Sequence, residues 1–122
     1  MRRRARPRPD ELEPVFAAVA RYFGLLSDPT RLRILHTICN VERSVSAIVA
    51  ATGATQTNVS RHLALLHRAG VVRRHRNGSS VFYGAADPEL VSICRSVCTR
   101  IAAQIDKGIP LKRELLAFAQ RR

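Results

Sequence analysis

The sequence predicts a mainly α-helical domain that carries one small β-hairpin. Two observations indicate this class. Apolar residues recur every three or four positions over most of the 122 residues, and this period changes to an alternation of two around Asn77-Gly78. At this length we expect one domain over residues 11–107, with a disordered basic arm (1–10) before it and a short helix or tail (108–122) after it.

The first two helices are predicted on either side of a turn at Asp28-Pro29. Asp10 and Glu13 form a capping pair ahead of apolar residues at helical spacing, which predicts a helix over 11–26. Asp28 suits the N-cap of the next helix, over 29–39, because Pro29 fits the first helical position without losing a hydrogen bond.

The next two helices are short and closely spaced. Ser44 or Ser46 caps a helix that Gly53 ends, and Thr55 caps another over 56–69. Two helices joined by a tight glycine turn are typical of a helix-turn-helix.

A hairpin and a closing helix follow. Residues 71–76 and 81–84 flank Asn77-Gly78, a strong hairpin signal because both central residues of such a turn take positive φ. Asp87-Pro88 then begins a long amphipathic helix, and a last short helix is expected around 111–120.

The charge is distributed unevenly along the chain. The formal net charge is +12, and the stretch 43–86 contains six arginines and no carboxylate. Such a stretch cannot neutralise itself, so we expect a polyanion as its partner. The first eight residues add five arginines without an acid and are expected to contribute sequence-independent affinity.

The helix over 56–69 is the candidate recognition helix, because the N-terminal end of such a helix enters the major groove of DNA. The polar side chains at this end are Thr55, Gln56, Thr57, Asn58, Ser60, Arg61 and His62. Gln56 and Asn58 suit adenine edges, and Arg61 suits guanine or a phosphate. The basic residues beside the hairpin turn, expected to follow phosphates or probe the minor groove, are Arg73, Arg74, His75 and Arg76.

The segments Leu26–Leu35 (LSDPTRLRIL) and Thr57–Leu66 (TNVSRHLALL), with Gly70-Val71 following, resemble the ArsR/SmtB family of bacterial repressors. The resemblance covers about residues 15–105. It implies a winged helix-turn-helix that dimerises through its first and last long helices and binds double-stranded operator DNA. It also implies that DNA is released when a metal, metalloid or oxidant acts on the dimer.

Several other classes of protein are disfavoured. No apolar run approaches the ~20 residues that span a bilayer, and three cysteines are too few for a secreted disulfide framework, so a cytoplasmic protein is expected. No glycine-rich phosphate loop, Ser/His/Asp order, paired carboxylates or CxxC turn is present, so we expect neither an enzyme nor a cofactor required for folding. A non-specific basic nucleic-acid-binding protein remains an alternative, but it does not explain the helix-turn-helix followed by a hairpin.

The three cysteines are candidate sensing residues. Cys94 and Cys98 lie one turn apart on one helix face, where two thiolates can bind one soft ion but are poorly placed for a mutual disulfide. Cys39 ends the second helix. If the closing helix packs over that turn in either protomer, three thiols would suit arsenite or another soft metal ion; His36 is a weaker candidate ligand.

Two other interpretations of these cysteines stay open. Cys39 and one of the pair could form a disulfide or polysulfide link under oxidants or reactive sulfur, as a redox or persulfide switch. All three could instead be small core residues. The resemblance does not decide between these interpretations of the cysteines. Many family members use cysteines in the helix before the recognition helix, but Ala47–Ala50 contain none; others use histidines of the closing helix, but this chain has no histidine after His75.

Overall fold

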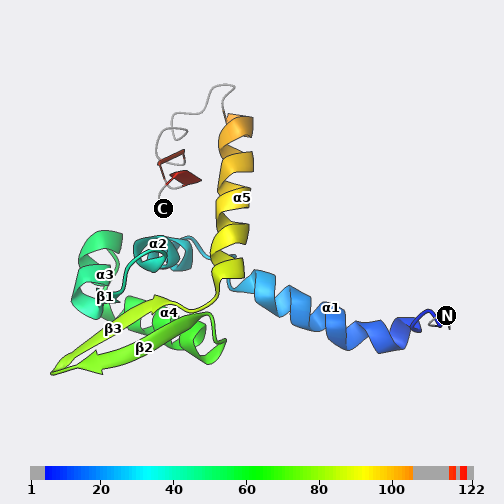
Figure 1. The fold of residues 1–122 in the computed structure, drawn as a ribbon, viewed down its shortest axis with the longest axis horizontal. Helices are drawn as coiled ribbons and strands as arrows, with labels where there is room; N and C mark the ends of the chain where they lie inside the picture. The colour runs from blue at the N-terminus through cyan, green and yellow to red at the C-terminus, as the bar shows by residue number, and fades with distance from the viewer. Residues whose placement is uncertain (1–4, 106–115, 118, 121–122) are drawn as a thin grey trace.

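The computed structural model describes residues 5–105 together with 116, 117, 119 and 120 (Figure 1). Its elements, in chain order, are α1 (Pro9–Gly24), α2 (Pro29–Ile38), β1 (Arg43–Ser44), α3 (Val45–Thr52), α4 (Gln56–Arg68), β2 (Val72–Asn77), β3 (Ser80–Ala85) and α5 (Pro88–Ile105). The predicted class, mainly helical with a small sheet, is confirmed. The helix expected around 111–120 lies largely outside the described residues.

The elements form a packed body from which two helices project. α2, α3, α4 and the sheet make the body, while α1 runs out to one side and α5 rises from it (Figure 1). The buried core is shared by four helices and the start of β2: Ile34, Leu35, Ile38, Ile48, Val59, Leu63, Leu66, Val71, Val72 and Leu90. Because α4 supplies three of these residues, the core fixes its orientation and leaves its opposite face in solvent.

Residues of α2 hold the turn between α1 and α2. The Asp28 carboxylate accepts a hydrogen bond from the Arg31 amide at 3.0 Å, which confirms the predicted N-cap. The Arg31 side chain turns back to α1, where Nη2 donates to the Gly24 carbonyl at 2.9 Å and Nε to the Leu25 carbonyl at 3.0 Å. These bonds hold the end of α1 against α2, and the Gly24 carbonyl also accepts from the amide and the hydroxyl of Ser27. α1 ends at Gly24, two residues before the predicted position.

The beginning of α1 also differs from the prediction. The helix starts at Pro9, because Glu11 rather than Glu13 closes its first turn: the Glu11 carboxylate accepts from the Arg8 amide at 3.1 Å. Pro9 fits the first position for the reason that Pro29 does in α2. The last residues of the predicted arm therefore belong to the first helix.

The sheet has three strands in the order β1-β3-β2, all antiparallel. The segment before α3 contains the two-residue strand β1, which pairs with β3. In the hairpin, Asn77 pairs with Ser80, so the central turn residues are Gly78 and Ser79 and not Asn77-Gly78 as predicted. Of these two central residues, Gly78 alone has a positive φ (64°). This is the pattern of a type II′ turn, whose first central residue is glycine.

The start of α5 connects the two projecting helices. One Asp87 carboxylate oxygen accepts from the amide of Glu89 at 3.0 Å, as predicted for a helix-starting residue. The other accepts from the Tyr22 hydroxyl of α1 at 3.1 Å. Among the described residues, no helix is long and apolar enough to cross a membrane.

Candidate nucleic-acid interface

α4 has one buried face and one polar face. The Thr55 hydroxyl accepts from the Asn58 amide at 3.2 Å, which fixes the first turn of the helix. Val59 and Leu63 are fully buried on one side. The exposed side carries most of the polar residues that the sequence predicted to face DNA: Thr55, Gln56, Thr57, Ser60 and Arg61.

Arg61 and Asn58 form a pair on the surface of α4. The guanidinium Nη2 donates to the Asn58 amide oxygen at 2.6 Å. A bidentate contact between asparagine and adenine needs that oxygen as an acceptor as well as the amide nitrogen as a donor. Because an amide oxygen has two lone pairs, Asn58 can accept from adenine either with Arg61 still bound or after the two side chains separate.

His62 lies on the buried face of α4 and not on the polar face with its predicted companions. The residue is 7% exposed. Its Nε2 lies 3.7 Å from an Asp28 carboxylate oxygen, and its Nδ1 lies 3.5 Å from Nη1 of Arg31. Burial lowers the pKa of His62, an effect that the nearby Asp28 carboxylate opposes. This placement makes His62 a link between α4 and the turn before α2 instead of a DNA-facing group.

Gln56 and Ser60 face the hairpin, which we call the wing (β2, β3 and their turn), across an open groove. The groove has a volume of about 400 Å³, and Arg74 and Ser80 are among the wing residues that line it. Arg74 and Arg76 are exposed and alternate with Arg73 and His75 along β2, so the two pairs point to opposite faces of the wing. The structure thus brings base-reading and phosphate-binding side chain types to one surface.

The opposite face of the wing is neutralised by an acid that the sequence reasoning missed. Glu42 accepts from Nε of Arg73 at 2.8 Å and lies 3.3 Å from Nδ1 of His75. The hydrogen bond from Arg73 is the main reason that the pKa of Glu42 is lowered. Arg73 also donates to the Ala85 carbonyl. These contacts bind Arg73 to the protein itself, and its phosphate contact stays a prediction.

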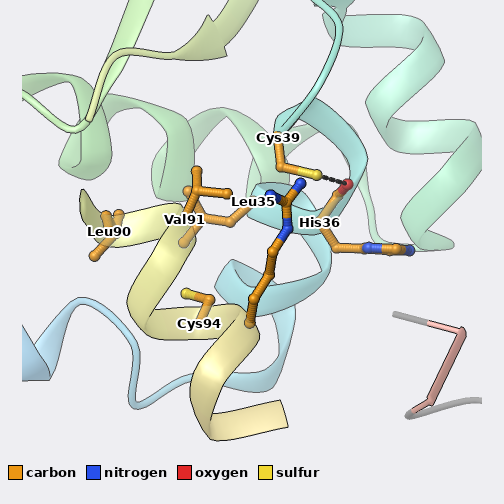
Figure 2. Close-up of a pocket in the computed structure, with 7 residues that line it drawn as sticks. Leu35, His36, Cys39, Leu90, Val91 and Cys94 are labelled. Carbon is orange, nitrogen blue, oxygen red and sulfur yellow. Dashed lines mark hydrogen bonds between the residues drawn. The ribbon is translucent and has the colours of Figure 1, made fainter. Parts of the chain in front are cut away.

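Two of the three cysteines line one small pocket between α2 and α5 (Figure 2). The pocket has a volume of about 20 Å³, and Leu35, His36, Cys39, Leu90, Val91, Cys94 and Arg95 line it. The Cys39 thiol donates to the His36 carbonyl at 3.2 Å, as the dashed line in Figure 2 shows. α5 therefore packs over the end of α2, as the cysteine hypothesis required.

Burial disfavours the thiolate form of both cysteines of α5. Burial raises the pKa of Cys94, and the neighbouring Cys98 and Cys39 raise it further. Burial also raises the pKa of Cys98. Within residues 5–105, no group of three or more His, Cys, Asp or Glu side chains is placed to hold a metal ion. A single chain thus brings two of the three predicted thiols to one pocket but does not assemble the three-ligand site.

Comparisons with known proteins place these features in a family. A family model described as bacterial regulatory protein, arsR family, matches residues 28–74, from the N-cap of α2 into β2. The HTH-type transcriptional regulator Rv0081 of Mycobacterium tuberculosis is 36% identical over 95 residues, which cover 75% of this chain and 83% of the relative. A probable mercury resistance operon repressor of Streptomyces lividans is 38% identical over 90 residues, covering 71% and 72% of the two chains.

Solved structures agree with the sequence relatives. The crystal structure of Rv0081 matches with a TM-score of 0.67 and 32% identity, covering 75% of this chain and 96% of that one. The homodimeric winged helix-turn-helix DNA-binding domain of Mb0332 from Mycobacterium bovis matches with a TM-score of 0.66 and 27% identity, over 84% and 93% of the chains. On its sequence, its helix-turn-helix and its wing, the chain belongs to the ArsR/SmtB family of winged helix-turn-helix transcriptional regulators.

Proposed function

We propose that this protein is a homodimeric repressor that reads operator DNA with the exposed face of α4 and follows the phosphate backbone with its wing. The groove between these elements carries the proposal. Gln56 and Ser60 on one side are suited to base edges and phosphates, and Arg74 on the other is suited to phosphates. Within the described ranges of the chain, no carboxylate lines this groove. Thr55, Thr57, Asn58 and Arg61 extend this surface along α4, and Arg76 extends it along the wing.

The dimer is inferred from an apolar surface that the single chain leaves open. α1 is 16 residues long and has no buried residue, and even its large apolar side chains are open to solvent: Phe16 is 61% and Phe23 is 56% exposed. On α5, Val97 and Ile101 are also exposed. A helix of this length is marginal in water without a packed apolar face, so a second copy that covers α1 and α5 would stabilise both. The homodimeric state of Mb0332 supports this arrangement.

The experiment compares duplexes and variants. The purified protein is titrated, by fluorescence anisotropy at physiological salt, into a duplex from its own promoter region and into a shuffled duplex of equal composition. We expect specific binding by a dimer, and we expect Arg61→Ala to cost ~1–3 kcal/mol on the promoter duplex only. Arg33→Ala, on the exposed side of α2, is the matched control. Equal affinity of the wild type for both duplexes would instead identify a non-specific basic nucleic-acid-binding protein.

The inducer is proposed to be a thiol-reactive agent that acts at the pocket shared by Cys39 and Cys94. Two chemistries use this pair: a soft ion such as arsenite bound through both sulfurs, and a disulfide or polysulfide link made by an oxidant or reactive sulfur species. A link of either kind would join α2, in the DNA-binding body, to α5, in the inferred dimer interface. The name of the Streptomyces relative, a probable mercury resistance operon repressor, supports a soft metal, and the presence of two thiols at one pocket supports the redox switch.

Each cysteine can be tested separately. Operator release is measured with arsenite, Cd(II), polysulfide and diamide for the Cys39→Ser, Cys94→Ser and Cys98→Ser variants. We expect serine at Cys39 or Cys94 to leave DNA affinity intact and to abolish release. Normal release from the Cys39/Cys94 double variant with every agent would make these cysteines packing residues. The proposed role requires no catalytic group and no cofactor for folding, and it is exercised in the cytoplasm, where the operator lies.

A further inference from the structure

A second groove lies between α1 and α4, on a part of the chain that neither the DNA-reading surface nor the thiol pocket uses. Its volume is about 560 Å³, within the range of small-molecule sites. Ala18 and Leu25 on the α1 side and Leu65 and Ala69 on the α4 side provide apolar walls. The groove therefore offers apolar surface to a molecule of a few carbon atoms or more.

Three arginines line the same groove, one from each of three helices: Arg21 from α1, Arg31 from α2 and Arg68 from α4. Arg31 is held in place by the carbonyls of Gly24 and Leu25. Arg21 and Arg68 are exposed, and within the described part of the chain neither has an ion pair with a carboxylate. Among the residues that the structure describes, no acidic residue lines the groove.

Converging positive charge on apolar walls is complementary to an anion that carries an apolar part. A guanidinium binds a carboxylate or phosphate through paired N–H donors, and the apolar walls favour a ligand with a hydrocarbon body over a bare ion. We propose that the groove between α1 and α4 is an effector site for a small amphipathic organic anion such as a carboxylate. This effector site goes beyond the proposed function, which places the inducer at the thiols of Cys39 and Cys94.

The groove residues connect the ligand position to the DNA-reading helix. Arg31 lies at the groove, binds the last carbonyls of α1 and lies 3.5 Å from His62 on α4. Arg68 and Leu65 belong to α4 itself. An anion that binds arginines from α1, α2 and α4 at once favours one placement of α4 relative to α1, and operator affinity changes by the difference in anion affinity between the two placements.

The site is tested first without DNA, so that its failure is distinguishable from a failure of the proposed function. Octanoate and inorganic phosphate are titrated into the full chain by isothermal calorimetry. We expect octanoate to bind more tightly than phosphate. The Arg21→Gln/Arg68→Gln double variant should bind octanoate at least tenfold more weakly, and the Arg33→Gln/Arg100→Gln variant, with the same charge loss outside the groove, should bind it normally.

A variant that keeps every charge tests the apolar walls. Ala69→Phe places a ring at the groove while leaving the arginines in place, and it should weaken octanoate binding without altering far-ultraviolet circular dichroism. Octanoate should also shift the operator affinity of the wild type by threefold or more, and operator DNA should shift octanoate affinity by the same factor.

Four results would overturn the inference. The first is an absence of octanoate binding to the full chain, as expected if the partner protomer fills the groove. The second is phosphate binding as tight as octanoate binding, and the third is octanoate binding that leaves operator affinity unchanged. The fourth is that the wild type does not bind octanoate while the Arg21→Gln/Arg68→Gln variant binds duplex DNA more weakly and with a smaller dependence on salt concentration. This result would assign the two arginines to DNA phosphates.

Discussion

Replacing Arg31 with methionine should destabilise the protein by separating α1 from the body. The Arg31 guanidinium makes two hydrogen bonds to main-chain carbonyls at the end of α1, at 2.9 and 3.0 Å. Hydrogen bonds from a charged donor contribute roughly 1.5–3 kcal/mol each, and the partial exposure of Arg31 reduces this by about half. Methionine keeps most of the aliphatic stem, so the expected loss of unfolding free energy is about 2 kcal/mol.

The measurement is urea unfolding followed by circular dichroism, at one fixed protomer concentration because the proposed dimer would add to apparent stability. For a chain of this size a loss of about 2 kcal/mol lowers the urea midpoint by roughly 1 M. Arg33→Met is a close control, since it removes the same charge from the same helix two residues later, where the side chain is exposed. Equal midpoints for Arg31→Met and Arg33→Met would refute the view that Arg31 holds α1.

Three further predictions concern the interface, the wing and pH. Ile101→Asp should give monomers by sedimentation velocity, whereas Ser96→Asp on the other side of α5 should not; a dimer with Asp at 101 would remove Ile101 from the interface. Glu42→Gln should free Arg73 and strengthen binding to all duplexes alike, so a change in sequence preference would count against its role as a neutralising acid. Because folding lowers the pKa of His62, the unfolded chain binds more protons than the folded chain below about pH 6.5. The free energy of unfolding should therefore fall as the pH drops through that value. His62→Leu should flatten this dependence on pH, and an unchanged dependence would contradict the assignment to His62.

Local capping signals made most helix boundaries predictable from the sequence. Asp28, Ser44 and Thr55 each accept a hydrogen bond from the amide three residues ahead, so the side chain and its partner lie within one turn. The exception was the start of α1, where Glu13 was predicted to close the first turn and Glu11 closes it instead. Glu11 prevails because Pro9 places the helix start two residues earlier than the predicted one.

Features that depend on distant partners were not predictable in the same way. β1 has two residues and exists only because it pairs with β3, some 40 residues later in the chain. Glu42 likewise reaches Arg73 and His75 only because the fold brings together residues that are 31 or more positions apart. The position of His62 could have been found, because Val59, His62 and Leu66 follow helical spacing on one face, but the polar character of histidine outweighed its position in the pattern.

The two helices at which the proposed signals act, α1 and α5, project from the body for most of their length, although Leu90 at the start of α5 belongs to the core (Figure 1). α1 has no buried residue, and its connections include the Arg31 hydrogen bonds and the Tyr22–Asp87 bond to the start of α5. Shifting an operator from mostly bound to mostly free requires about 5.5 kcal/mol of differential affinity. Contacts worth a few kcal/mol can be outweighed by a sulfur–metal bond or an ion-paired ligand, whereas the fully buried cluster of α2, α3 and α4 cannot. In the proposed dimer, regulation at the edges of α1 and α5 would therefore move the DNA-reading surfaces of the two protomers relative to each other without unfolding either.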